Sequence, residues 1–191
     1  MVKKLSSSAT GTAFQAQQLK LARKLLALTE AGIAQAEAAA GDARLSGASL
    51  ILSSPYTRAL QTAAIISRKT GIPLRVELGL HEWVIDTSYR FASQEYTAGA
   101  LEECVRCRGV QSPGTQYRWE PLEDVAKRAY AALYPYEQEE KIIVVSHGIV
   151  MRQFVCRERI PYCGIEETDF DRNFRWPGFR EEAYRVFRRK K

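Results

Sequence analysis

Histidine is scarce in this sequence: the 191 residues include only two, His81 and His147. Long apolar runs are absent, and no stretch approaches the roughly 20 residues that a membrane-spanning helix needs. The first residues also lack the apolar core of a signal peptide. These absences predict a cytoplasmic protein without a membrane partner, and they restrict any histidine-based chemistry to two positions.

Basic helices and aromatic-rich strands, which nucleic-acid-binding proteins use, do not stand out either. The net charge is +6, and much of it lies in the last third of the chain and in residues 188–191. We interpret this charge as a solvated tail; the alternative is attraction of anionic partners such as phosphorylated substrates. No nucleic-acid partner is predicted, and the sequence leaves the oligomeric state open.

Cysteine is also sparse, with four residues, and in a chain predicted to be intracellular these are interpreted as free thiols. Cys104 and Cys107 have the spacing of metal ligands, and Cys156 with Cys163 would complete a set of four. Six residues separate the second pair, which is a wide spacing for a zinc site. We therefore predict no metal and no organic cofactor, with a zinc-stabilised interaction domain as a minor alternative.

The chain does contain an alternation of apolar strands and helices, in a length suited to a single domain over residues 1–191. Strands are predicted over 49–52, 73–76, 141–145 and 165–170. Helices are predicted over 31–40 with Thr29 as N-cap, from Ser54-Pro55 to 69 with Gly71 as the stop, and over 122–134 and 149–156. This order predicts an α/β fold, a three-layer α/β/α sandwich with a largely parallel central sheet.

Regular periodicity fades between Trp83 and Trp119. The stretch is interrupted by Gly99, Gly109 and Pro113-Gly114, residues that are typical of turns. We predict that residues 84–119 form an insertion or lid rather than an element of the core.

The most informative segment is Ser146-His147-Gly148, which lies where the apolar run 142–145 stops and a helical pattern starts. The unpaired N–H groups and the dipole at the start of a helix favour a bound anion. An imidazole at that place adds a donor that changes its protonation state near neutral pH. The segment predicts an anion site, and the remaining question is which other residues join it.

Three further segments precede it in the chain, at 28–36, 53–63 and 80–83, and the second of them reads SSPYTRALQTA. In this order and spacing, the four segments resemble the histidine phosphatase superfamily, which has the phosphoglycerate-mutase-like fold. The resemblance covers roughly residues 28–164. The second segment is the most specific, the Ser-His-Gly segment alone is weak, and the ordered set is strong.

The resemblance implies roles for four residues. Arg58, in the first turn of its helix, would grip the phosphate together with backbone N–H groups of that turn, and Gly148 would also bind the phosphate. Glu82 would be the general acid that protonates the leaving alkoxide, and His147 would donate to the phosphoryl oxygens and stabilise the transition state. Read without the motifs, three of them have a plainer interpretation: Arg58 as a surface arginine, Glu82 as a loop carboxylate and His147 as a core histidine.

One residue of the family pattern is missing. The resemblance implies a nucleophilic histidine in an Arg-His-Gly box after the first strand, which carries the phosphoryl group as a covalent intermediate. No histidine lies before Leu28, and residues 1–27 form an atypical segment without the expected apolar strand. His81 neighbours the presumed acid and is not expected to substitute, and Ser8 has no obvious base. No nucleophile is therefore assigned.

A frameshift would explain this segment, and we state it as a hypothesis. Read two bases later, serine codons of the TCN type can encode Phe, Leu, Ile or Val, and the next three codons can encode Arg-His-Gly. The codons concerned are those of Ser6, Ser7, Ser8, Ala9, Thr10 and Gly11. The nucleotide sequence decides this, because third bases that forbid Arg and His would end the idea.

Our leading interpretation is a phosphatase that hydrolyses phosphate monoesters through a phosphohistidine and is impaired or inactive as written. The short chain favours a phosphatase over a mutase, and the expected partner is a small phosphorylated substrate. The alternative is a pseudophosphatase that binds phosphorylated ligands or a protein without turnover. Ser146 lacks the elbow motif of a serine hydrolase. Substrate specificity would reside in the irregular region, which carries Arg90, Arg106, Arg108 and Arg118.

Overall fold

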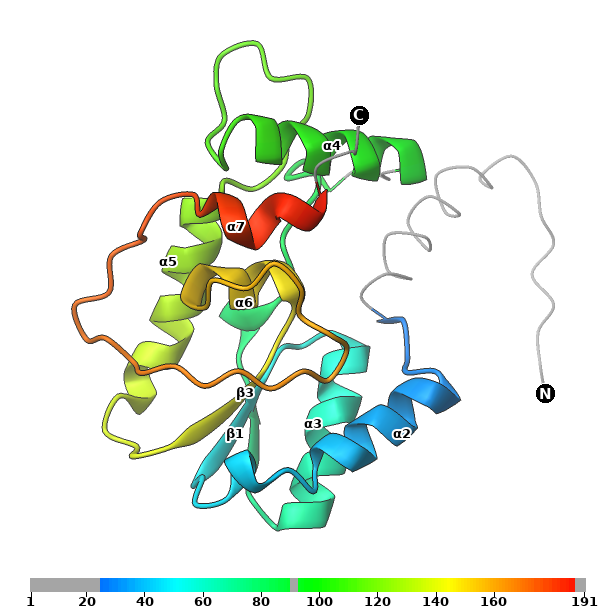
Figure 1. The fold of residues 1–191 in the computed structure, drawn as a ribbon, viewed down its shortest axis with the longest axis vertical. Coiled ribbons are helices and arrows are strands. Elements are labelled where there is room, and N and C mark those ends of the chain that lie inside the picture. The colour runs from blue at the N-terminus through cyan, green and yellow to red at the C-terminus, as the bar shows by residue number, and fades with distance from the viewer. Residues whose placement is uncertain (1–24, 90–92, 188–191) are drawn as a thin grey trace, which may run out of the picture.

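A computed structural model describes residues 25–89 and 93–187 of the chain (Figure 1). At its centre lies a three-stranded sheet in the order β2-β1-β3. The strands are β1 (Leu50–Ser53), β2 (Leu74–Val76) and β3 (Ile142–Val145). Both pairings are parallel, with Ile51 opposite Leu74 and Leu50 opposite Ile142. The three strands predicted at these places and the parallel sheet are confirmed.

Helices cover both faces of this sheet. On one face lie α2 (Glu30–Ala39) and α3 (Thr57–Thr70), and on the other lie α5 (Leu122–Leu133) and α6 (Gly148–Phe154) (Figure 1). Strand β1 serves both layers because successive side chains point to opposite faces. Ile51 joins the smaller core cluster beside α3, whereas Leu50 and Leu52 join the larger one beside α5. The predicted α/β sandwich is therefore confirmed.

The short elements complete the order of the chain. Turns of 3₁₀ helix occur as η1 (Ala43–Leu45), η2 (Leu78–Leu80), η3 (Tyr134–Tyr136) and η4 (Arg185–Phe187). Helix α4 (Gln94–Arg106) lies between η2 and α5, and α7 (Glu181–Tyr184) follows α6. Within the described ranges, no helix is both long enough and apolar enough to cross a membrane.

The helix ends agree with the sequence in two of three cases. Thr29 is the N-cap of α2 and accepts a hydrogen bond from the Gly32 N–H, and Gly71 closes α3 with φ of 76°. The predicted start of α3 at Ser54-Pro55 is wrong, because the helix begins at Thr57. The hydroxyl of Ser54 instead accepts a hydrogen bond from the Tyr56 N–H and contacts His147, so this serine does not serve as the N-cap of the helix.

Two other expectations are wrong. Residues 165–170 form no strand; Arg44 donates to the Ile165 carbonyl and Phe170 stacks on Tyr130. Residues 84–119 do contribute to the core, because α4 buries Ala100, Cys104 and Val105 in the larger cluster, which also holds Trp119. Whether this stretch is an insertion or a lid stays a prediction, as does the single domain.

The atypical N-terminal segment lacks the expected apolar strand, so the outer edge of β3, where a further strand could pair, is relevant to it. Among the residues that the structure describes, β3 forms a ladder with β1 only, and Val144 is 38% exposed. The first 24 residues, which include the serines discussed above, lie outside the described residues, as do Arg90 and residues 188–191. The interpretation of residues 1–27 as an atypical segment therefore stays a prediction.

The packing of α4 yields a test of stability. The buried Glu103 carboxylate accepts a hydrogen bond of 3.1 Å from the Trp119 indole N–H. Glu103→Ala would leave that buried donor unpaired, and we expect a loss of about 1–3 kcal/mol in the free energy of unfolding in urea. Glu103→Gln keeps an acceptor and should lose less. Glu102→Ala, on the exposed side of the same helix, is the matched control; an equal loss there would contradict this account.

Candidate functional site

The predicted site residues meet where the parallel strands end. Strand β1 leads into Ser54 and, two residues further, the N-cap of α3, so that Arg58 lies in the first turn of this helix. Strand β3 leads into His147, the N-cap of α6, and Gly148 is the first residue of that helix. Because carboxyl ends of parallel strands share one edge of the sheet, these side chains are brought together.

His147 is held between two partners. Its Nδ1 atom lies 3.2 Å from a terminal nitrogen of Arg58, and its Nε2 atom lies 2.7 Å from the Ser54 hydroxyl. A guanidinium only donates hydrogen bonds, so Nδ1 accepts. The neutral ring then carries its proton on Nε2 and donates it to Ser54. His147 therefore cannot act as a base toward Ser54, which argues against a serine nucleophile here.

Burial, with the positive charges of Arg58 and the neighbouring cations, lowers the pKa of His147 from 6.5 to about 3. The residue is only 6% exposed. In the ligand-free protein the ring is therefore neutral at pH 7. An anion that engaged Arg58 would remove part of the cause of this shift.

Glu82 lies after η2, in a segment without regular secondary structure. Desolvation raises the pKa of its carboxyl group, while the charges of Arg58 and Arg128 act in the opposite direction. The backbone N–H of Trp83 donates to this carboxylate at 2.9 Å, and the backbone N–H of Ile149, in the first turn of α6, also acts to lower its pKa. Glu82 thus lies close to both Arg58 and the helix that begins after His147.

Tyr56 and His81 complete the surroundings of His147, and the sequence patterns predicted no role at this site for either residue. The Tyr56 ring lies 5.1 Å from the His147 ring and 6.2 Å from the stacked ring of His81. The Arg58 guanidinium lies over Tyr56 at 5.3 Å. His81 donates from Nδ1 to the Glu82 carbonyl at 2.8 Å. Tyr56 lies within the most specific motif, two residues before Arg58, and this position could have indicated that it belongs to the site.

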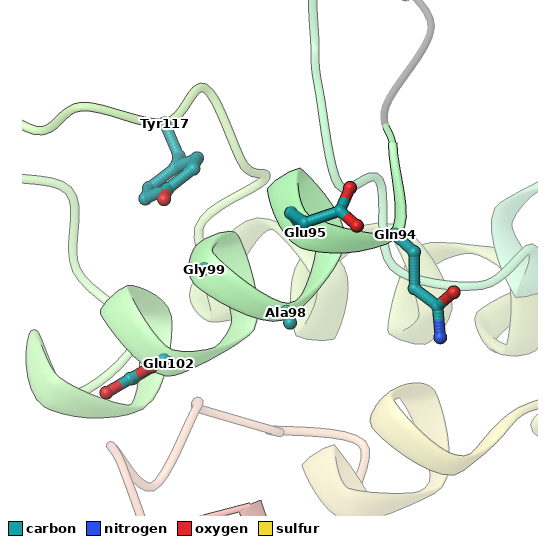
Figure 2. A pocket seen from close by; sticks show the side chains of 6 residues that line it. All are labelled: Gln94, Glu95, Ala98, Gly99, Glu102 and Tyr117. Atoms are coloured by element: carbon teal, nitrogen blue, oxygen red, sulfur yellow. The ribbon is translucent and has the colours of Figure 1, made fainter.

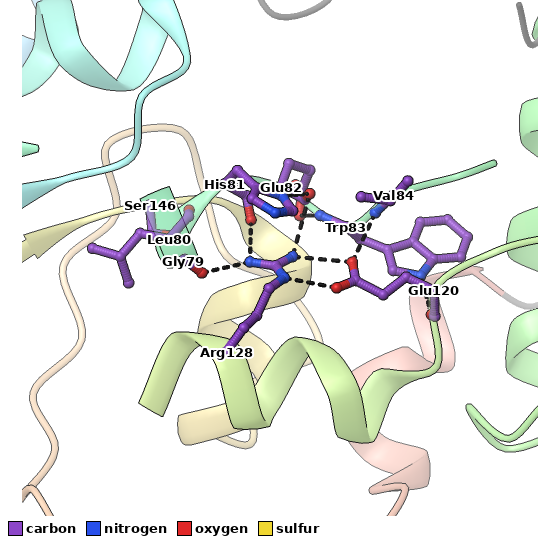
Figure 3. A network of polar contacts seen from close by, with 9 residues as sticks. All are labelled: Gly79, Leu80, His81, Glu82, Trp83, Val84, Glu120, Arg128 and Ser146. Carbon is purple, nitrogen blue, oxygen red and sulfur yellow. Dashed lines mark hydrogen bonds and ion pairs between the residues drawn. The ribbon is translucent and has the colours of Figure 1, made fainter. Parts of the chain in front are cut away.

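A second group that sequence reasoning missed supports the Glu82 segment. Figure 3 shows Arg128 of α5 between the carboxylate of Glu120 and the carbonyl groups of the chain before Trp83. Ser146 joins from the other side, since its hydroxyl donates to the Leu80 carbonyl at 2.9 Å. No motif pointed to Arg128 or Glu120, because each lies far from Glu82 in sequence.

An open hollow of about 590 Å³ lies on α4 and is a different place (Figure 2). Its lining holds two carboxylates and none of the predicted site residues; it consists of Gln94, Glu95, Ala98, Gly99, Glu102 and Tyr117. The carboxylates would repel a phosphate. Of the arginines expected to meet a substrate, Arg106 pairs with Glu103 and Arg108 pairs with Glu181.

The structure contradicts the alternative of a zinc site formed by the four cysteines. Cys104 and Cys107 lie on and at the end of α4, whereas Cys156 and Cys163 follow α6. All four are free thiols, and within residues 25–89 and 93–187 no three His, Cys, Asp or Glu side chains gather in a way that could hold a metal ion. The proposed four-cysteine zinc set is therefore wrong.

Comparisons with known proteins show what this chain is similar to. A family model described as the histidine phosphatase superfamily, branch 1, matches residues 12–172. No curated protein sequence matches the chain. Among solved structures, the native mycobacterial glucosyl-3-phosphoglycerate phosphatase is similar, with 25% identity and a TM-score of 0.52. The match covers 65% of this chain and 64% of that one, so the chain spans just under two thirds of that protein.

Two further solved structures are similar to this chain. A complex of the same mycobacterial phosphatase with inorganic phosphate shares 26% identity, with a TM-score of 0.50 over 65% of each chain. The Bacillus stearothermophilus protein YhfR shares 23% identity, with a TM-score of 0.50 over 71% of each chain. At that lower identity YhfR supports the fold alone.

The pKa of His147 predicts how stability depends on pH. A histidine whose folded-state pKa is lowered contributes stability that is complete above its unfolded pKa and is lost as pH falls toward the folded value. We expect the free energy of unfolding to fall between pH 6.5 and about 3 because the unfolded state takes up this proton first. His147→Gln should show a shallower fall.

Chemical denaturation across this pH range measures the effect. His81→Gln removes the only other histidine and is the matched control, which should keep the steep dependence. Parallel curves for the wild type and His147→Gln would contradict the buried, neutral state of His147.

Proposed function

The chain belongs to the histidine phosphatase superfamily, and on this basis we propose that its site binds the phosphoryl group of a small phosphate monoester. The observation that carries the proposal is the contact between Arg58 and His147, with the Glu82 carboxyl group within the electrostatic influence of Arg58. A planar guanidinium offers paired donors that match phosphate oxygens. The phosphatase neighbours, one of them in complex with inorganic phosphate, favour hydrolysis over phosphoryl transfer between substrates.

Arg58 would turn from the Nδ1 atom of His147 to the incoming phosphate. The negative charge of the ligand would then raise the pKa of His147, so that the ring takes up a proton and donates to a phosphoryl oxygen. Gly148, directly after the histidine, would let the backbone at the start of α6 approach the anion. These three groups would neutralise the phosphate without a metal ion.

Glu82 would serve as the general acid. A carboxyl group donates a proton to a leaving alkoxide only while it is protonated, so a raised pKa suits that task. The raised pKa of Glu82 and its place beside Arg58 support this role. A phosphate bound at Arg58 would add negative charge nearby and raise the pKa further.

The remaining requirement is a nucleophile. The chain holds no histidine besides His81 and His147, and His81 donates through Nδ1 to the Glu82 carbonyl. We propose that the chain as written binds phosphate esters and does not form the phosphohistidine that turnover in this family needs. The second candidate, a pseudophosphatase that works by binding alone, is favoured by the same missing histidine.

Phosphate binding tests the proposal directly. In calorimetric titrations with inorganic phosphate, Arg58→Ala should weaken binding by at least about tenfold because it removes a charged donor pair. Arg68→Ala is the matched control: it removes the same charge from the exposed last turn of the same helix. Equal affinities for the two variants would contradict the site.

Hydrolysis of p-nitrophenyl phosphate without added metal tests the missing nucleophile. We expect no turnover by the chain as written. A variant whose N-terminal segment is replaced by an apolar strand ending in Arg-His-Gly should gain activity that Glu82→Gln then reduces. Activity of the unaltered chain would mean that another residue attacks phosphorus, whereas silence of a folded restored variant would favour the binding protein.

A further inference from the structure

The segment that carries Glu82 has little backbone support of its own. Residues 81–85 follow η2 and belong to no helix or strand. One backbone hydrogen bond, from the Glu120 N–H to the Val84 carbonyl at 2.8 Å, ties this segment to a distant part of the chain. A carboxyl group on such a segment needs other contacts to keep its place relative to Arg58 and α6.

Arg128 provides these contacts. One terminal nitrogen donates to the Gly79 carbonyl at 2.5 Å and to the His81 carbonyl at 2.8 Å. The other donates to the Glu82 carbonyl at 3.4 Å (Figure 3). Three carbonyl groups around the turn are therefore gathered on one guanidinium, whose side chain is 18% exposed.

Glu120 fixes the guanidinium in turn. Its two carboxylate oxygens accept from Nε of Arg128 at 2.7 Å and from a terminal nitrogen at 3.1 Å. The same carboxylate accepts from the Val84 N–H at 3.0 Å, and the Glu120 carbonyl accepts from the Trp83 indole at 2.7 Å. All five N–H donors of a guanidinium thus have an acceptor. A lysine, with three donors on one atom, cannot reproduce this planar fork.

Gly79 shows independently how closely the turn lies against α5. A Cβ atom at this position would lie 2.5 Å from the Arg128 carbonyl oxygen and 2.8 Å from the Ala132 Cβ. Only glycine permits this approach without a shift of the backbone. The turn before Glu82 is therefore held against the helix at two points, by the guanidinium and by close packing.

From these contacts we propose that Arg128 and Glu120 are positioning residues that hold the Glu82 carboxyl beside Arg58 and the first turn of α6. The inference rests on the proposed function in that Glu82 is the proposed acid. Neither residue needs to touch the ligand. Their part is to keep the acid desolvated and aimed at the place where the leaving oxygen would lie.

Titration of Glu82 in the full chain tests this proposal without any ligand. The carboxyl carbons of ¹³C-labelled glutamate are followed by NMR, and Glu82→Gln identifies the signal. Arg128→Lys keeps the charge and loses the fork, so the pKa of Glu82 should fall toward the ordinary value of a glutamate as its carboxyl becomes hydrated. Lys127→Gln removes a charge from the next position on α5, where the lysine pairs with Glu123, and should leave the titration unchanged.

A wild-type titration curve in folded Arg128→Lys would overturn the proposal. If that variant does not fold, Gly79→Ala disturbs the same contact from the other side without any change of charge, and it should move the pKa in the same direction. Inorganic phosphate is then added in a separate step. In ¹⁵N-labelled protein, failure of phosphate to shift the ring signals of His147 would contradict the proposed function, while the ligand-free comparison of Glu82 titrations would still test the positioning role.

Discussion

The contact between the Arg58 guanidinium and the His147 imidazole is the interaction on which the site depends. A buried, neutral histidine accepts from a cation on one side and donates to the Ser54 hydroxyl on the other. The arrangement places two groups suited to a phosphate next to each other in a region of low exposure. It also couples ligand binding to the protonation of His147, because the charge of Arg58, which together with burial keeps the ring neutral, is the charge that an anion would engage.

The fold supplies this contact through three parallel strands that end at one edge of the sheet. Strand β1 delivers Ser54 and the helix with Arg58, and β3 delivers His147. The third strand, β2, is followed by the turn with Glu82, which has no ladder to hold it. Side chains from α5 and from the end of β3 replace that ladder: Arg128 binds carbonyl groups of the turn and Ser146 binds Leu80.

Sequence patterns predicted the parts of the site that adjoin strand ends. Apolar runs located the strands, and the motifs that carry the family resemblance indicated Arg58, five residues after the end of β1, and His147, two residues after the end of β3. Sequence could not predict the tautomer of His147, because that depends on a partner 89 positions away. It could not predict Arg128 and Glu120 either, since their contacts with the Glu82 turn are purely tertiary.

The failures in the fold have similar causes. Helix α4 was not predicted because the polar Glu103 lies on its buried face, where its carboxylate accepts a hydrogen bond from the Trp119 indole N–H. Residues 165–170 resembled a strand, yet they join no ladder, and the Ile165 carbonyl accepts a hydrogen bond from the Arg44 side chain. In each case a side-chain interaction across the fold outweighed the local pattern.

The most direct test of the central claim is the protonation state of His147, observed by ¹⁵N NMR near pH 6 with and without inorganic phosphate. With only two histidines in the chain, His81→Gln is enough to assign the signals. We expect a neutral ring with its proton on Nε2 in the free protein and protons on both nitrogens when phosphate is bound. A ring that is already charged in the free protein, or that stays neutral at saturating phosphate, would contradict this claim.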